Sequence, residues 1–232
     1  MDARACNEHT YQPADNCGPC KTDAIVDGDA EALGGWFARF QQGEVARQIP
    51  PRYQGARADE PEVLAWLAQW REHGTRCPSL LLTGNVGTGK TWQAYGAIKA
   101  AVTEVHPAVN DSPPSLRGWR PTRWIATTSA DMYAALRPQP KVDSEAALAA
   151  YRDTELLMID DLGAAKTSEW VEEITYRIIG GRYDAMLPTI YTTNVPTAKL
   201  REAIGDRITS RLAETCTRVA LTGEDRRRVK AA

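Results

Sequence analysis

The sequence predicts an α/β fold in which helices cover both faces of a parallel β-sheet. From Ser79 onward, short apolar runs alternate with longer helical stretches, a pattern typical of parallel strands joined by right-handed crossovers. The runs are nearly continuous in apolar residues, as expected when both faces of a sheet are buried. The expected strands are SLLLT (79–83), RWIAT (123–127), ELLMID (155–160), PTIYTT (188–193) and TRVAL (217–221).

The chain ahead of the first strand is expected to divide into an N-terminal segment and a linker. Residues 1–48 form the N-terminal segment, and residues 49–61, with prolines at both ends, are the expected linker. Residues 62–232 are expected to form the main domain, opened by a helix that follows Pro61. Within that domain, apolar periodicity predicts helices at 90–105, 129–136, 143–151, 168–186 and 197–212.

Net charge gives no support for general nucleic-acid binding, and hydropathy argues against membrane-spanning and secreted proteins. The net charge of −2 gives no general support for nucleic-acid binding, so such contacts would depend on local clusters of basic residues. No apolar run reaches the length of a membrane span, and the first residues lack the apolar stretch of a signal peptide. We therefore expect a cytoplasmic protein with no membrane association, in which cysteines stay reduced.

A glycine-rich loop joins the first expected strand to the next helix. It reads GNVGTGKT, and strand–loop–helix is the context in which such a loop binds phosphate. Its glycines let backbone N–H groups face phosphate oxygens, and the helix N-terminus adds positive potential. Lys90 is expected to reach the β- and γ-phosphates of ATP, and Thr91 to ligate Mg²⁺. The expected nucleotide-binding residues of the loop are Gly84, Asn85, Val86, Gly87, Thr88, Gly89, Lys90 and Thr91.

Polar residues end two later strands, at the edge of a parallel sheet where ligands bind. Asp160 and Asp161 follow four apolar residues. Asp160 is expected to hold Mg²⁺, and Asp161 to polarise the attacking water. Asn194 ends the next strand, where its amide could contact the γ-phosphate or position that water. The alternative for Asn194 is a turn-forming role ahead of Pro196.

Two arginines share one face of the last expected helix. Arg207 and Arg211 are four residues apart, so their side chains lie on the same side. Either one could reach the nucleotide of a neighbouring subunit as an arginine finger. The alternative is a solvated helix in which an aspartate pairs with an arginine.

Taken in order, these motifs resemble the DnaC/IstB group of AAA+ ATPases. The resemblance rests on GNVGTGKT, LLMIDDLG, TTN, DRITSRL and the closing GEDRRR, and it runs from about Gly55 to Arg228. It implies an AAA+ P-loop core with a five-stranded parallel sheet and the P-loop strand at its centre. Only residues 222–232 follow the last strand, so the helical lid usual in AAA+ proteins is expected to be reduced or absent.

The resemblance also implies a mode of assembly. Subunits would form a ring or spiral in which Arg211, rather than Arg207, acts on the neighbour's ATP. Arg226 would contact the nucleotide as a second sensor. Because this group contains helicase loaders, the resemblance implies ATP hydrolysis, with a replicative DNA helicase and single-stranded DNA as partners.

Other functions remain open at this stage. An IstB-like transposition helper acting on duplex DNA shares the same core. A small-molecule P-loop kinase and an ATP-gated adaptor with little turnover are further alternatives.

Contacts with single-stranded DNA are expected at Tyr133, Arg137 and residues 166–168. Basic and aromatic side chains of this kind bind single-stranded DNA irrespective of its sequence.

Four potential metal ligands cluster near the N-terminus. They form a C-x₂-H pair and a C-x₂-C pair, which together suit tetrahedral Zn²⁺, and they are Cys6, His9, Cys17 and Cys20. The segment has almost no core of its own, so metal could supply its folding energy. A tail with incidental cysteines and a redox C-x-x-C pair are the alternatives.

The N-terminal segment is also the expected contact with the helicase. In the part that follows the cysteines, apolar side chains recur at helical spacing: Leu33, Trp36, Phe37 and Phe40. We expect this apolar face to dock on the helicase, with the zinc knuckle stiffening the segment. The alternative is that the aromatic residues pack on the chain's own ATPase core.

Overall fold

The computed structural model describes residues 43, 45–103, 122–138, 140, 143–165, 168–223 and 225. The chain divides into two compact units, of which the second comprises Ile49–Val102 and Thr122–Ala232. This second unit contains the sheet and the helices described below. The N-terminal aromatic residues, Arg226 and the four predicted zinc ligands all lie outside the described residues.

The second unit is built on a five-stranded, all-parallel sheet with strand order β2-β3-β4-β1-β5. This confirms the fold class and each of the expected strands. β1, which carries the P-loop, lies between β4 and β5 and therefore one strand away from the edge. The expectation of a central P-loop strand was wrong, because β4 inserts between β1 and β3. The strands are β1 (Ser79–Thr83), β2 (Trp124–Thr128), β3 (Leu156–Asp160), β4 (Thr189–Thr193) and β5 (Cys216–Ala220).

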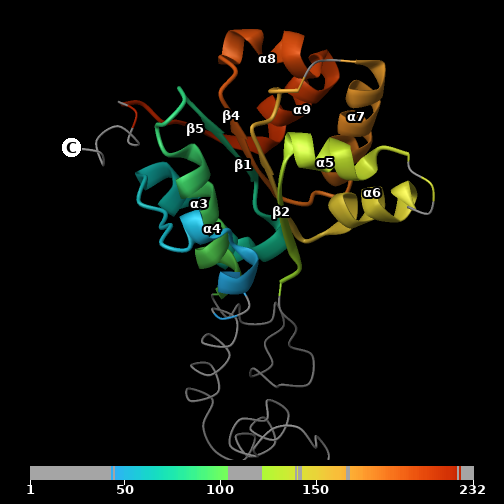
Figure 1. Cartoon of the computed structure of the whole chain (residues 1–232). Coiled ribbons are helices and arrows are strands. Elements are labelled where there is room, and N and C mark those ends of the chain that lie inside the picture. The colour runs from blue at the N-terminus through green and yellow to red at the C-terminus, as the bar shows by residue number, and fades with distance from the viewer. Residues whose placement is uncertain are drawn as a thin grey trace, which may run out of the picture. The chain divides into compact units, whose positions relative to one another are not determined.

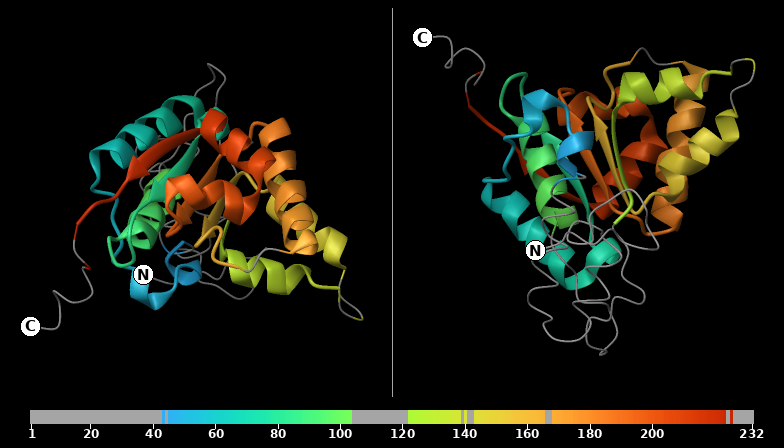
Figure 2. Two further views of the ribbon diagram at one scale, coloured as in Figure 1. Left: turned by 90° about the horizontal axis from the view of Figure 1, so that it is seen from above. Right: turned by 60° about the horizontal axis from the view of Figure 1, so that its bottom comes forward.

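Helices cover the sheet on both faces, as Figure 1 shows and Figure 2 repeats from above. On one face lie α3 (Pro61–His73) and α4 (Lys90–Thr103). The other face carries α5 (Ser129–Leu136), α6 (Ser144–Asp153), α7 (Glu169–Asp184) and α9 (Asp206–Thr215). This double covering explains why the strands are continuous apolar runs.

The core is densely apolar on both sides of the sheet. Leu157 and Ile159 of β3 pack in one cluster with residues of α5 and α7, while Leu80 and Leu82 of β1 are fully buried as well. On the α3 side, two buried tryptophans use their ring N–H groups: Trp66 donates to the Pro78 carbonyl at 2.6 Å and Trp70 to that of Ala101 at 2.8 Å. Both aromatic anchors are therefore buried without losing a hydrogen bond.

The residues expected as one helix at 197–212 form two. α8 (Thr197–Ile204) ends at Gly205, whose φ of 84° lies in the left-handed region. Glycine adopts that conformation without steric cost, so the chain turns there and α9 begins at Asp206. The break sets the direction of α9, and with it the direction of the two arginines.

Residues 49–61, expected as a linker, pack along α4. A Cβ atom at Gly96 would collide with the backbone of Arg57 and Ala58, so glycine is what allows this close approach. The Gln93 side chain is hydrogen-bonded to the Asp59 carboxylate and accepts from the backbone N–H of Asp59 at 3.0 Å. This segment belongs to the same compact unit as the sheet.

The chain after β5 contains no helix in its described part, Leu221–Gly223 and Asp225. Within the described ranges, no helix is both long and apolar enough to cross a membrane.

Candidate functional site

The P-loop connects the end of β1 to the start of α4. Gly84, Gly87 and Gly89 all have positive φ, at 145°, 85° and 99°. Such backbone angles curl the loop and are strained for any residue with a side chain. Lys90 begins α4 and is 5% exposed, and its Nζ donates to the carbonyls of Gly84 at 2.9 Å and Asn85 at 2.7 Å. The ammonium group therefore lies over the loop.

Asp160 joins the P-loop helix to the centre of the sheet. At the end of β3, its carboxylate accepts from Thr91 Oγ at 3.0 and 3.2 Å. It also accepts from Thr192 Oγ on the neighbouring strand β4 at 2.5 Å. The two residues predicted to ligate Mg²⁺, Thr91 and Asp160, are thus brought together over 69 positions of sequence. Thr192 belongs to the TTN motif, but the sequence interpretation gave a role only to Asn194 of that motif.

The Asp160 carboxyl is largely removed from solvent. Burial raises its pKa above the usual aspartate value, the hydrogen bond from Thr192 opposes this, and the charge of Asp161 adds to the rise. A buried carboxylate beside a second acid is electrostatically costly, and a divalent cation would relieve that cost. The donor set of one hydroxyl and one carboxylate suits Mg²⁺, which prefers oxygen ligands.

Asp161 is held in an unusual backbone conformation. Its φ is 55°, in the left-handed region, where few residues with side chains are found. Two hydroxyl groups fix the residue: Asp161 N–H donates to Thr192 Oγ at 3.0 Å, and Ser129 Oγ donates to the Asp161 carbonyl at 2.8 Å. Such strain persists where the surroundings hold it, often at functional sites. Ser129, unlike Thr192, lies in no motif that the sequence analysis recognised.

Asn194 lies beside Asp161. Its side-chain N–H₂ donates to the Asp161 carboxylate at 2.6 Å, across 33 positions of sequence. The amide thereby fixes the orientation of the acid predicted to polarise water. Lys90, Thr91, Asp160, Asp161 and Asn194 therefore form one contiguous group at the carboxyl edge of β1, β3 and β4.

The C-terminal segment returns to the P-loop. After β5, the Leu221 N–H donates to the Thr83 carbonyl at 2.8 Å. A little further on, the Asp225 carboxylate fills the space that a Cβ atom at Gly87 would need. The neighbouring Arg226, predicted as a second sensor, lies outside the described residues.

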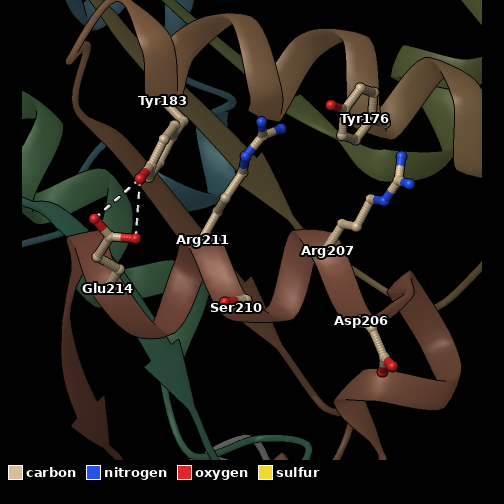
Figure 3. A pocket seen from close by; sticks show the side chains of 7 residues that line it. All are labelled: Tyr176, Tyr183, Asp206, Arg207, Ser210, Arg211 and Glu214. Carbon is tan, nitrogen blue, oxygen red and sulfur yellow. Dashed lines mark hydrogen bonds between the residues drawn. The ribbon is translucent and has the colours of Figure 1, made fainter.

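Arg207 and Arg211 lie on α9 and face α7 rather than the chain's own P-loop. Arg211 contacts the rings of Tyr176 and Tyr183, while Arg207 is exposed and lies 6.0 Å from the Tyr176 ring (Figure 3). Neither arginine contributes to the nucleotide edge of its own chain through any hydrogen bond of the described residues.

The structure describes only some of the residues that were predicted to contact single-stranded DNA. The Arg137 guanidinium lies 5.6 Å from the Trp170 ring, and Tyr133 meets the same ring edge-on at 6.1 Å. Tyr133 is buried, with its hydroxyl bonded to Thr175 at 2.6 Å, so it is a core residue. Lys166 and Thr167 lie outside the described residues.

Comparison with solved structures gives close matches in fold. The crystal structure of the DnaC helicase loader matches with a TM-score of 0.59 and 20% identity, covering 75% of this chain and 100% of that one. The crystal structure of DnaI matches with a TM-score of 0.59 and 17% identity, covering 79% and 99%. AMPPCP-bound DnaA from Aquifex aeolicus matches with a TM-score of 0.52 and 21% identity, covering 73% and 47%.

The chain has the AAA+ P-loop fold. The expected resemblance to helicase-loader AAA+ proteins is confirmed at this level, since at these identities the likeness shows the fold. No family model matches the chain, and no curated protein does so. Among the described residues, no three potential ligands of the His, Cys, Asp and Glu types cluster as a metal site. The zinc prediction concerns residues outside that range.

Proposed function

We propose that this protein binds and hydrolyses Mg-ATP and acts in DNA replication as a helicase loader. The observation that carries the ATPase part is the hydrogen bond between Thr91 and Asp160, which couples the P-loop to the end of β3. A phosphate cradle and a buried acid in direct contact are what a Mg-nucleotide site requires. The Asp161–Asn194 pair beside them supplies groups for directing water.

Each residue of the site has a role in this proposal. The P-loop amides and Lys90 would hold the phosphates, and Thr91 and Asp160 would hold Mg²⁺. The cation, when bound, neutralises charge on the phosphates. Asp161 would accept a proton from the attacking water, and Asn194 would keep that carboxylate aligned. Arg211 of one copy would contact the nucleotide of the next copy in a ring or spiral, and Arg226 would contact it from its own chain.

The helicase-loading part rests on two supports. Two of the similar structures are the DnaC helicase loader and DnaI, each of which is covered almost completely by this chain. The motif order from GNVGTGKT to DRITSRL resembles the DnaC/IstB group, which contains helicase loaders. Partners would be a replicative DNA helicase, bound through residues 1–48, and single-stranded DNA. An IstB-like helper acting on duplex DNA is the second candidate.

We also propose that Cys6, His9, Cys17 and Cys20 bind Zn²⁺. The pairs have chelating spacing, and tetrahedral sulfur and nitrogen coordination suits zinc. Purified protein should contain one equivalent of zinc by elemental analysis, and the double substitution Cys17→Ser with Cys20→Ser should lose it. Retention of the metal in that variant would contradict the proposal.

Lys90→Ala tests the ATPase proposal directly. Loss of the ammonium should weaken ATP binding about a hundredfold or more and abolish hydrolysis, since this group contacts the phosphates. Binding is measured by isothermal titration and hydrolysis by phosphate release. Lys199→Ala, an exposed lysine on α8, is the matched control and should behave like wild type. Equal affinity in the two variants would refute the site.

Capture of a partner protein distinguishes a helicase loader from a transposition helper. With ATP present, the protein should retain a replicative helicase from its native host, and deletion of residues 1–48 should abolish this while ATP binding persists. Single-stranded DNA should bind better than duplex and more weakly as salt rises. Capture of a transposase, together with a preference for duplex DNA, would favour the helper instead.

A further inference from the structure

The face of α7 that meets α9 carries a notch between two tyrosine rings. Tyr176 and Tyr183 are seven residues apart, so both project from one side of the helix. Gly180 lies between them on that same side, and its missing side chain leaves the gap. The Arg211 guanidinium occupies this notch, 4.8 Å from the Tyr176 ring centroid and 5.0 Å from that of Tyr183 (Figure 3).

The fit between the guanidinium and Gly180 is close. A Cβ atom at Gly180 would lie 2.5 Å from Arg211 Nη1, which is shorter than any contact that a real Cβ makes. Even alanine would therefore displace the guanidinium. Glu214 fixes one wall, because the Tyr183 hydroxyl donates to both of its carboxylate oxygens at 2.9 Å. This hydrogen bond also raises the pKa of Tyr183.

The notch is not an ordinary stabilising contact. Arg211 Nη1 is buried, yet it has no hydrogen-bond acceptor among the described residues. A buried guanidinium nitrogen without an acceptor is costly, and this cost offsets the attraction of the two rings. Arg211 also lines an open cavity of about 590 Å³, together with Asp206, Arg207 and Ser210. The rings thus hold the charge beside open space.

We propose that Tyr176, Gly180 and Tyr183, with Glu214 behind Tyr183, are positioning residues for Arg211. They fix one orientation of a long side chain before a second copy arrives, which lowers the entropy lost when Arg211 meets that copy's nucleotide. Arg207 lies outside the notch, so the same geometry selects Arg211 of the two arginines. This inference rests on the proposed ATPase and on its assembly.

The test uses two variants that are each inactive alone. Arg211→Ala subunits keep their nucleotide site and lack the arginine, whereas Asp161→Asn subunits keep the arginine and lack the acid. If Arg211 acts between copies, mixing the two should restore ATP hydrolysis at the Arg211→Ala sites. Gly180→Ala is then added to the Asp161→Asn subunit. Because alanine favours helix over glycine, this change should not unfold α7.

We expect Gly180→Ala to lower kcat of the mixture roughly tenfold or more, with KM unchanged, because a displaced arginine acts on turnover rather than on substrate binding. Gly181→Ala is the matched control, because its Cβ would meet only the flexible side chain of Arg152. Tyr183→Ala should behave like Gly180→Ala, and Tyr183→Phe should lower the activity only about two- to fivefold because it restores the ring.

Three outcomes are informative. Selective loss with Gly180→Ala and Tyr183→Ala supports the notch. Restored hydrolysis that is equal for Gly180→Ala and Gly181→Ala subunits overturns it while leaving the proposed function intact. Absence of hydrolysis in the first mixture, without any change at Gly180, overturns the action of Arg211 between copies and the notch with it.

Discussion

Two arginines, one within α7 and one packed against it, are held in different ways. Arg182, within α7, is 1% exposed and donates to one hydroxyl and four carbonyl groups at 2.6–3.1 Å. Arg211, from α9, is held by two aromatic rings and leaves Nη1 without an acceptor in the described structure. Each nitrogen of the Arg182 guanidinium has an acceptor in its own chain, whereas the Arg211 guanidinium has a nitrogen without one among the described residues.

The difference separates a structural role from a functional one. The acceptors of Arg182 are the carbonyls at the end of α6 and the turn before β4, so this residue ties two elements together. Burial lowers its pKa to about 10, which leaves the group charged at neutral pH. Arg211 has rings that orient its charge and few partners that neutralise it. Removing each arginine should therefore change a different property of the protein.

Arg211→Ala gives the largest expected effect, and it should fall on activity. ATP turnover should drop about a thousandfold, as for other arginines that act on a neighbour's nucleotide, while affinity for ATP stays the same. The free energy of unfolding should change by about 1 kcal/mol or less, because only cation–π contacts are lost. Steady-state kinetics and urea denaturation measure the two. A smaller kinetic defect in Arg211→Ala than in Arg207→Ala would reverse the assignment.

Arg182→Met should give the opposite result, with the effect on stability. Loss of the guanidinium leaves buried carbonyls without donors, and we expect the free energy of unfolding to fall by about 3 kcal/mol. Turnover per folded molecule should change little at a temperature where the variant stays folded. Urea denaturation checks the first point and kinetics at low temperature the second. Wild-type stability in this variant would mean that the carbonyls find other partners.

Asp160→Asn extends the comparison to a buried negative charge. Because burial raises the pKa of Asp160, the folded state holds that proton more tightly than the unfolded chain does. Stability without nucleotide should therefore fall as pH rises from the usual aspartate pKa through the raised one, and stay lower above it. The asparagine variant lacks this loss, so it should be more stable than wild type at neutral pH.

Denaturation at several pH values, without Mg²⁺ or nucleotide, tests this prediction. The control is Asp206→Asn, an exposed acid whose surface pair with Arg201, at 2.9 Å, should contribute little. If the free energy of unfolding changes with pH in the same way for Asp160→Asn and wild type, the pKa of the Asp160 carboxyl is not raised by folding.

Tyr183→Phe gives the smallest expected effect. The variant keeps the ring against Arg211 and loses only the hydrogen bond to Glu214. Turnover should fall by about two- to fivefold, which corresponds to the loss of one hydrogen bond of roughly 0.5–1 kcal/mol. Steady-state hydrolysis compared with Glu214→Gln checks it. A defect as large as that of Arg211→Ala would place the hydroxyl itself at the nucleotide.

Sequence patterns predicted the strands and the nucleotide edge because both depend on local or regularly spaced residues. Glycine spacing in the P-loop and the acids after β3 reflect backbone geometry and sheet polarity. Thr192 and Ser129 escaped notice because hydroxyl residues in strands and at helix starts are common, and their role depends on distant partners. The break at Gly205 was missed because an amphipathic pattern continues on both sides of it.

The sequence by itself determined the α/β class, the phosphate-binding loop and the acids at the end of β3, because each follows from residue type and spacing along the chain. Only the tertiary structure decided that β4 separates β1 from β3, that residues 49–61 pack on α4, and that Arg211 lies in a notch cut by Gly180. These features depend on contacts between segments far apart in sequence, which a periodic pattern does not specify.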